Sequence, residues 1–390
     1  MREGWTYKKL GECFPYIKNG ANIKQIKGAK GYPITRIETL SGGVFNRDRM
    51  GYADIFDINK FQDYILKNGD LLMSHINSKA YIGRTVQYTS QNDEVIIHGM
   101  NLLRLKSNES VILSSFFKFY TDSWYFKTDI ASIRKDAVNQ SSFAISDLKN
   151  FKVPIPPLSE QQSIVAELDK INELISLKKA QLSDLDNLAQ SIFYEMFGDP
   201  IENKKGWEVR KLGEVVDITA KLVDPNQEPY CNQFHVGPAN IIGGTGEIVD
   251  CLIAKDENLI SGKYAFKSGD VLYSKIRPNL NKVAIPSFEG VCSADMYPLS
   301  IKTNAVNLYI MRLLMTKEFL KYAVNCSGRA RMPKINREAL FEFKFCLPPL
   351  SLQQEFAKRI ELIEQQKAQI SSTIKDLETL LASRMQYWFD

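Results

Sequence analysis

Residues 153–162 read Val-Pro-Ile-Pro-Pro-Leu-Ser-Glu-Gln-Gln, and residues 345–354 read Phe-Cys-Leu-Pro-Pro-Leu-Ser-Leu-Gln-Gln. Adjacent prolines cannot lie inside a helix or a central strand, because they remove backbone donors and fix φ. A serine followed three residues later by a glutamine has the pattern of a capping box, which marks the start of a helix. Both stretches therefore predict a change from a globular domain to a helix, with Ser159 and Ser351 as capping residues.

A heptad seam follows each of these stretches. Apolar residues recur at alternating steps of four and three from Ile164 and again from Phe356. This spacing places them on one helix face and is typical of a coiled coil. Lys178 and Lys367 interrupt the seams, and they either set the register or extend their amines to solvent. The seam residues are Leu168, Ile171, Ile175, Leu182 and Leu185 in the first helix, and Ile360, Ile363, Ile370, Ile374 and Leu377 in the second.

Two equal seams in one chain favour pairing between the helices, although each helix could instead pack on its own globular domain. The helix ends at 192–197 and 385–389 are aromatic and have more apolar surface than a two-helix seam needs. They suit either contact with partner helices or burial against the globular domains.

The chain is an internal duplication. Residues 4–12, which begin Gly-Trp, return at 206–214, and the Gly-Asp stretch at 68–76 returns at 268–276. The proline-containing stretches form a third match in the same order. Short β-branched and aromatic runs, broken by turn residues, fill the segments before each helix, and helical stretches follow at 115–127 and 306–324. The predicted fold is therefore α+β, with a pseudo-two-fold internal repeat.

Four segments follow from these boundaries: head 1, spacer helix 1, head 2 and spacer helix 2. Gly198 and Pro200 end the first helix. That helix is about 58 Å long at ~1.5 Å per residue. The linker to Trp207 spans at most about 28 Å. The second head is therefore expected at the far end of the first helix, and the second helix should return antiparallel as a coiled-coil spacer. The segments are 1–155, 156–198, 199–346 and 347–390.

Charge is distributed unequally between the heads and the helices. Head 1 has 22 Lys and Arg against 15 Asp and Glu, and head 2 has 20 against 17. Both helical segments are net negative, so the heads carry the positive excess of a chain whose net charge is +5. Such an excess is needed for phosphate contact, although a solvated basic surface would show it too.

Two loops in each head contain the residue types that contact DNA. One loop follows the repeated Gly-Asp strand, and the other precedes the proline-containing stretch. Arg, Asn and Gln read base edges, while Arg and Lys hold phosphates. The candidate DNA-binding residues are Lys79, Arg84, Arg134, Lys135, Asn139 and Gln140 in head 1, and Arg277, Asn279, Lys282, Arg329, Arg331 and Lys334 in head 2.

This order of motifs resembles the specificity subunit of type I restriction-modification systems. The resemblance covers the whole chain, and Pro-Pro-Leu-Ser-Glu-Gln-Gln before a heptad helix is its most specific element. It implies that each head is a target recognition domain for one half of a bipartite, asymmetric double-stranded DNA sequence. It also implies that the helices fix the gap and dock two modification (methyltransferase) subunits, which use S-adenosylmethionine. Restriction (translocase/endonuclease) subunits would join this complex.

The chain itself is expected to bind no cofactor and no metal, and to carry out no chemistry. It lacks the tetrapeptide of an amino-methyltransferase and a P-loop. Its six cysteines are widely spaced without a CxxC pair, and only Cys231 and His235 lie within one turn. With no signal peptide and no apolar run long enough for a membrane, a cytoplasmic location is expected.

The heads differ from each other outside the repeated stretches. Residues 23–50 and 222–246 show little mutual similarity. Two heads with one framework and different loops should read different half-sites, so a non-palindromic target is expected. A two-headed scaffold for proteins is the alternative, and it would have no salt-sensitive affinity for DNA.

Overall fold

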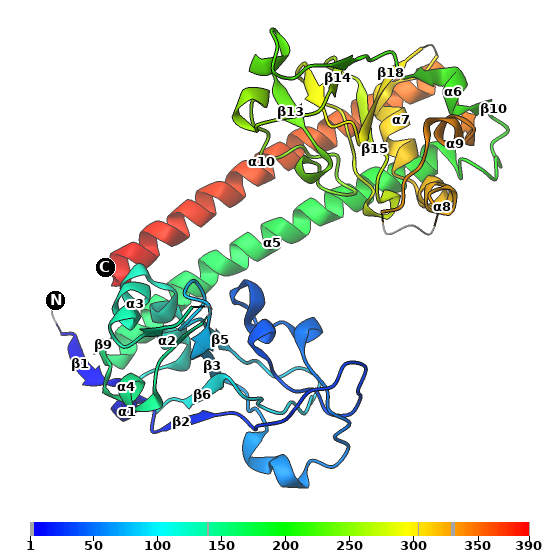
Figure 1. Ribbon diagram of the computed structural model, residues 1–390. Helices are drawn as coiled ribbons and strands as arrows, with labels where there is room; N and C mark the ends of the chain where they lie inside the picture. The colour runs from blue at the N-terminus through cyan, green and yellow to red at the C-terminus, as the bar shows by residue number, and fades with distance from the viewer. Residues whose placement is uncertain (1–3, 139, 303, 329–331, 390) are drawn as a thin grey trace. The chain divides into compact units, whose positions relative to one another are not determined.

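The computed structural model describes residues 4–138, 140–302, 304–328 and 332–389. The chain forms two compact units (Figure 1). Unit 1 consists of residues 1–177 and 374–390, and unit 2 consists of residues 178–373. Each unit therefore contains one head, the beginning of one long helix and the end of the other. The long helices are α5 (Leu158–Phe197) and α10 (Leu350–Phe389).

The head of unit 1 is an antiparallel sheet in the order β2-β6-β3-β5, followed by short helices. A separate strand pair, β1 with β9, joins the beginning of the head to the residues before α5. The framework elements are β1 (Thr6–Lys9), α1 (Leu10–Cys13), β2 (Tyr16–Asn19), β3 (Leu71–Ser74), β5 (Thr85–Gln87), β6 (Leu102–Lys106), α2 (Ser114–Asp122), α3 (Trp124–Asp129), α4 (Ile145–Asn150) and β9 (Lys152–Ile155).

The head of unit 2 repeats this framework element by element. Its sheet has the equivalent order β11-β18-β15-β16, and β10 pairs with β19. The elements are β10 (Glu208–Lys211), α6 (Leu212–Val215), β11 (Val216–Asp217), β15 (Val271–Ser274), β16 (Val283–Ala284), β18 (Met296–Ile301), α7 (Asn307–Leu314), α8 (Lys317–Cys326), α9 (Arg337–Phe341) and β19 (Lys344–Leu347). The α+β repeat predicted from the sequence is confirmed.

The repeated Gly-Asp pair is the turn that starts the central strand of each sheet. Gly69 and Gly269 have φ of 86° and 87°, which is the left-handed region that favours glycine. The carboxylate that follows accepts a hydrogen bond of 2.8 Å from the backbone N–H three residues earlier, at Lys67 in one head and Lys267 in the other. The strands that follow, β3 and β15, are buried throughout.

The two heads differ beyond this framework. Unit 2 has a second four-stranded sheet, β12-β14-β17-β13. Unit 1 has in this region three 3₁₀ helices and single β-bridges, such as Ile34 with Ile97. The additional elements of unit 2 are β12 (Leu222–Val223), η5 (Tyr230–Asn232), β13 (Phe234–Val236), η6 (Pro238–Asn240), η7 (Ala254–Asp256), β14 (Lys263–Phe266) and β17 (Gly290–Cys292), and those of unit 1 are η1 (Ile37–Gly43), η2 (Arg47–Arg49) and η3 (Asn59–Tyr64).

The helical stretches predicted at 115–127 and 306–324 are each divided into two helices. Ser123 ends α2, and its Oγ accepts a hydrogen bond from the Phe126 N–H at the start of α3. Thr316 has the same place between α7 and α8, where its Oγ1 accepts from the Phe319 N–H. A capping side chain thus begins a new helix within an apolar pattern that continues across the break.

The predicted capping boxes are wrong in their details, although helices do begin at these stretches. Because α5 begins at Leu158 and α10 at Leu350, the two serines already lie inside the first helical turn. The polar residue of each stretch that is buried is instead its first glutamine. The Gln161 amide accepts a hydrogen bond from the Leu113 N–H (2.8 Å) and donates to the carbonyls of Val111 and Pro156 (2.9 Å each).

Gln353 makes the same three bonds in unit 2. Its amide accepts from the Val306 N–H (3.0 Å) and donates to the carbonyls of Asn304 (3.1 Å) and Pro348 (2.7 Å). Both glutamine side chains are fully buried. The repeated glutamine therefore ties the start of each long helix to the residues just before α2 or α7.

Most of the predicted seam is buried within its unit. Leu168, Ile171 and Ile175 of α5 are buried, as are Ile360, Ile363, Ile370 and Ile374 of α10, whereas Leu182, Leu185 and Leu377 are half-buried. In unit 2, Lys367 lies 2.8 Å from the Asp186 carboxylate on the other helix. In unit 1, Arg384 pairs with Glu167, and Trp388 Nε1 donates to the same carboxylate at 2.9 Å.

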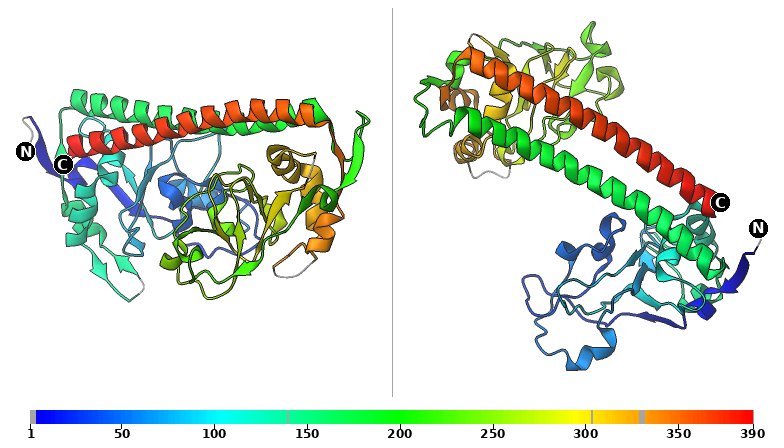
Figure 2. Two further views of the ribbon diagram at one scale, coloured as in Figure 1. Left: turned by 90° about the horizontal axis from the view of Figure 1, so that it is seen from above. Right: turned by 180° about the vertical axis from the view of Figure 1, so that it is seen from behind.

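The two helix segments run antiparallel in each unit. In unit 2, Lys367 contacts Asp186, while Phe356 near the start of α10 packs against Phe197 at the end of α5. Figure 2 shows the two segments side by side from two further directions. The aromatic helix ends are partly explained by burial against the heads: Phe197 contacts Tyr309 of α7, and Phe389 contacts Phe116 of α2.

Candidate nucleic-acid interface

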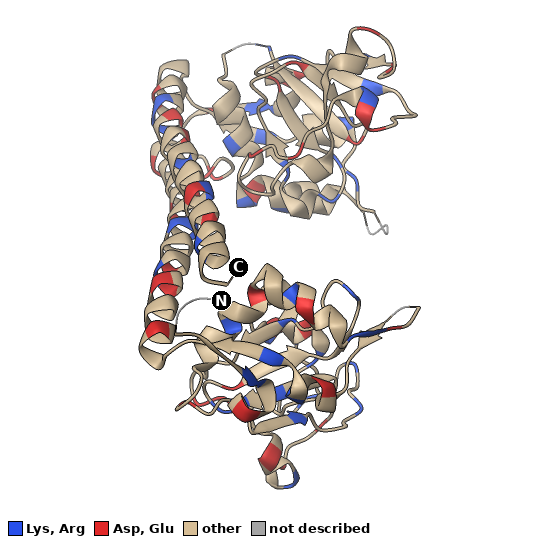
Figure 3. Ribbon diagram, turned by 90° about the vertical axis from the view of Figure 1, so that its left-hand side faces the viewer, with Lys and Arg blue, Asp and Glu red and all other residues tan. Residues whose placement is uncertain are grey.

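A small sheet in unit 1 brings the two candidate loops of head 1 together. It has the order β4-β8-β7, formed by β4 (Ile76–Asn77), β7 (Lys135–Asp136) and β8 (Ser141–Ser142). Lys79 follows β4, and the β7–β8 hairpin holds the second set of candidates. Figure 3 shows Lys and Arg on the strand that leads to the hairpin tip. Residues separated by about sixty positions in the sequence thus share one surface.

Asp136 connects the members of this surface. Its Oδ1 accepts from Arg134 Nε (2.7 Å) and from Ser141 Oγ (2.6 Å), and its Oδ2 lies 3.9 Å from Lys79 Nζ. The hydrogen bond from Arg134 is the main reason that the pKa of Asp136 is lowered. Only 13% of the Arg134 side chain is exposed, so this arginine braces the hairpin, while Lys79, at 73%, is available to a ligand.

The other candidates of head 1 are placed differently. Lys135 and Gln140 are exposed on the hairpin, and Asn139 lies outside the described residues. The Arg84 guanidinium lies over the Tyr81 ring, 4.3 Å from its centroid, and donates to the Leu40 carbonyl. Arg84 is therefore half-buried.

An equivalent arrangement occurs in unit 2. Ile276 forms an antiparallel bridge with Lys334, and the Arg277 N–H donates to the Pro333 carbonyl at 2.8 Å. Next to this bridge the Ile335 N–H donates to the Lys275 carbonyl. The corresponding bond in unit 1 runs from the Phe143 N–H to the His75 carbonyl. Both heads therefore use main-chain pairing to join the same two loops.

Four candidates of head 2 lie within the described residues, and three of them are exposed. Arg277, Asn279 and Lys334 are exposed, with Asn279 in η8 (Pro278–Leu280). Lys282 is half-buried, and its amine donates to the Pro238 carbonyl. Arg329 and Arg331 lie outside the described residues.

Lys275 is a basic residue that the motif reasoning missed. It is buried beside the Ile276–Lys334 bridge, with its amine 5.0 Å from the centroid of the Tyr297 ring. Burial lowers the pKa of Lys275, and the neighbouring Lys334 lowers it further. The repeat aligns Lys275 with His75, so a basic position next to both loops was visible in the sequence.

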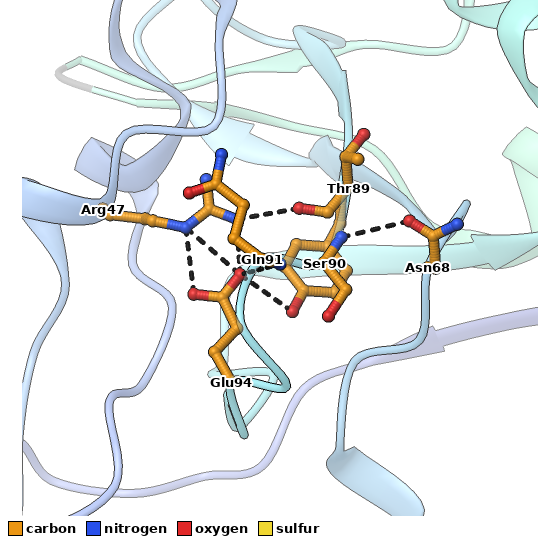
Figure 4. A network of polar contacts seen from close by, with 7 residues as sticks. Arg47, Asn68, Thr89, Ser90, Gln91 and Glu94 are labelled. Carbon is orange, nitrogen blue, oxygen red and sulfur yellow. Dashed lines mark hydrogen bonds and ion pairs between the residues drawn. The ribbon is translucent and has the colours of Figure 1, made fainter.

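The segment of head 1 that has no counterpart in head 2 is held by an ion-pair network (Figure 4). Arg47 of η2 pairs with Glu94 and donates to the Thr89 carbonyl at 2.8 Å. The hydrogen bond from Arg47 is the main cause of the lowered pKa of Glu94. Since Arg84 also donates to Leu40 in η1, this head-specific segment is fixed beside the candidate interface.

Two related heads, each with a basic surface assembled from two loops, define a tandem recognition protein. The family model for the type I restriction modification DNA specificity domain matches residues 2–187 and 204–379. The chain therefore belongs to this family, as the sequence motifs predicted. Its role is DNA-sequence specificity, and in this family catalysis lies in partner subunits.

Individual relatives agree with this assignment. The putative type I restriction enzyme MjaX specificity subunit of Methanocaldococcus jannaschii is 29% identical over 97% of this chain and 93% of its own length. The EcoDI specificity subunit of Escherichia coli is 30% identical over 55% of each chain. A crystal structure of the S subunit of a type I system from M. genitalium shares the fold, with a TM-score of 0.53, 15% identity and coverage of 99% of this chain and 96% of that one. Within the described residues, no helix has the length and apolarity required to cross a membrane.

Proposed function

We propose that each head reads one half of a bipartite, asymmetric DNA target through the surface formed by its two joined loops. The observation that carries this proposal is the main-chain pairing of β4 with β8 in unit 1 and of Ile276 with Lys334 in unit 2. It gathers exposed Lys79 and Lys135 in one head, and Arg277 and Lys334 in the other. The head-specific segments beside these surfaces support different half-sites.

Membership of this family also suggests partner proteins. Two modification subunits that use S-adenosylmethionine would dock on the paired helices, and restriction subunits would join them in a cytoplasmic complex. Leu188 in unit 2 and Leu380 in unit 1 occupy equivalent helix positions and are 47% and 45% exposed. Two equivalent apolar positions suit two copies of one partner, and the mass of the assembled complex tests this number.

The DNA-reading role is tested by selecting duplexes from a random pool with the full chain. We expect two constant segments separated by a fixed gap, without inverted-repeat symmetry. Replacing Lys79 and Lys135 with alanine should weaken binding and reduce the slope of log K against log salt by about 2, since each phosphate contact contributes about 0.9.

Lys170 and Lys375 provide the matched control. They are exposed on α5 and α10 of unit 1, and carry the same total charge outside the proposed interface. Their double alanine variant should retain the wild-type salt slope. A palindromic selected target, or equal losses from both pairs, would contradict the proposed reading surface.

A further inference from the structure

The tip of the β7–β8 hairpin exposes an apolar side chain that the charged interface does not require. Val138 is 99% exposed. The N–H of the preceding residue, Ala137, donates to the Gln140 carbonyl at 2.8 Å, and this bond joins the two strands of the hairpin next to its turn. Lys135 and Gln140 flank the valine and are also exposed. A branched aliphatic side chain therefore projects from a hairpin whose other outward groups suit phosphates and base edges.

The base of this hairpin is braced. Asp136 accepts hydrogen bonds from both Arg134 and Ser141, and β8 pairs with β4 of the head. Because these bonds fix the two strands, they also hold Val138, which follows β7 closely, near a set place on unit 1. A side chain held in this way can press between bases, whereas one on a loose loop would move aside.

We propose that Val138 is a wedge that inserts at a base step of the half-site read by head 1 and unstacks it. This inference rests on the proposed DNA-reading function. Architectural DNA-binding proteins read the minor groove with basic and amide side chains, and they insert apolar side chains between base steps and partially unstack them. Unstacking also lowers the cost of extruding a base, which any enzyme that modifies a base in a duplex requires. The wedge would thus prepare the DNA for the methylating partner.

Head 2 has a different residue in the corresponding segment. Met332 is 53% exposed and precedes Pro333 and Lys334, which are held by the bridge to Ile276. Methionine is more flexible than valine. We assign the wedge to Val138, so distortion is expected in the half-site that head 1 reads.

The test uses the full chain and a duplex selected from a random pool, with 2-aminopurine placed in turn at each base step. Wild-type protein should raise the fluorescence several-fold at one step of the head 1 half-site. In Val138→Ser this rise should disappear and affinity should fall about tenfold. The salt slope should stay unchanged because no charge is removed. Val138→Leu keeps an aliphatic side chain and should show the same rise in fluorescence as wild type.

Ile260→Ser is the matched control, since Ile260 is also 99% exposed but lies between η7 and β14 of unit 2. It should leave fluorescence and affinity unchanged. If wild-type protein selects a target and no step responds, or if Val138→Ser responds like wild type, the wedge is refuted while the DNA-reading role stands. If no sequence is selected, the DNA-reading role itself fails.

Discussion

Unit 1 and unit 2 share their framework but differ in the part of each head that surrounds it. The shared elements are the antiparallel sheet, the strand pair that leads into the long helix, and the buried glutamine that ties the helix to the head. The additional elements are a second sheet in unit 2 and 3₁₀ helices with single bridges in unit 1.

The difference indicates which parts of a head can vary independently. The shared strand pair and the shared buried glutamine tie each long helix to its head. In the sequence, the parts that differ lie mainly between β2 and β3 in unit 1 and between β11 and β15 in unit 2. In unit 1 they are fixed by their own ion pairs, such as Arg47 with Glu94. Recognition loops can therefore change without disturbing the support of the helices.

The largest expected effect tests the shared glutamine. Replacing Gln161 with leucine leaves its three backbone partners, one buried and two half-buried, without this hydrogen bond, and a buried unpaired group costs roughly 1–3 kcal/mol. We expect the free energy of unfolding of unit 1 to fall by about 4 kcal/mol. Gln353→Leu should have a similar effect on unit 2, and urea unfolding measures both.

The neighbouring glutamines are the matched controls. Gln162 and Gln354 belong to the same repeated motif but are exposed. Their leucine variants should leave the unfolding free energy within about 0.5 kcal/mol of wild type. Equal losses from both glutamines of a pair would break the claim that the first glutamine is the shared element.

A smaller loss of stability is expected from an ion pair that unit 2 has within the shared framework and unit 1 lacks. Arg312 of α7 is 2% exposed, and its guanidinium donates to the Glu364 carboxylate of α10 at 3.0 Å. Burial lowers the pKa of Arg312, and the nearby Glu364 acts in the opposite direction. Removing the carboxylate with Glu364→Ala leaves a buried charge without its partner, so we expect a loss of about 2 kcal/mol by urea unfolding.

Unit 1 has Phe119 and Asn172 at the corresponding positions. Asn172 is exposed, and its Nδ2 donates to the Leu168 carbonyl of its own helix. Asn172→Ala should therefore change stability by less than about 0.5 kcal/mol. A comparable loss in both variants would show that the ion pair does not distinguish the units.

The sequence was sufficient to predict the duplication, the α+β class and the two long helices, because these depend on spacing within one stretch of chain. Heptad positions such as Ile171 and Ile363 are buried as predicted. The capping serines were wrong because the pattern of a serine and a glutamine does not reveal a tertiary partner. Gln161 bonds to Val111 and Leu113, which lie some fifty residues earlier.

The candidate interface was predictable as a set of loops but not as a set of free side chains. Exposed Lys79 and Lys135 remain available to a ligand, whereas Arg134 and Lys282 are used inside the protein by Asp136 and by the Pro238 carbonyl. Composition gives the number of cations in a loop. Which of them are internally paired depends on a carboxylate or carbonyl that only the folded chain brings close.

The smallest expected effect concerns the helix pairing in unit 1. The hydrogen bond from Arg384 is the main cause of the lowered pKa of Glu167, and Trp388 contributes as well. A carboxylate with a lowered folded-state pKa adds stability above its unfolded pKa and loses it as the pH falls through the folded value. Since both side chains are about one third exposed and solvent screens the pair, Arg384→Gln should cost less stability at pH 7 than Glu364→Ala does.

The pH dependence separates this pair from an ordinary surface pair. The stability difference between wild type and Arg384→Gln should shrink steadily when unfolding is measured from pH 7 down to pH 2. Arg359 is the control because it occupies in α10 the place of Glu167 in α5. It pairs with Glu355 one turn away on the same helix, and both side chains are about half exposed. Arg359→Gln should cost about 0.3 kcal/mol. If the Arg384 effect is as small as this, or does not decline with pH, the charged contact does not contribute to holding α10 against α5 in unit 1, and the apolar seam alone is sufficient.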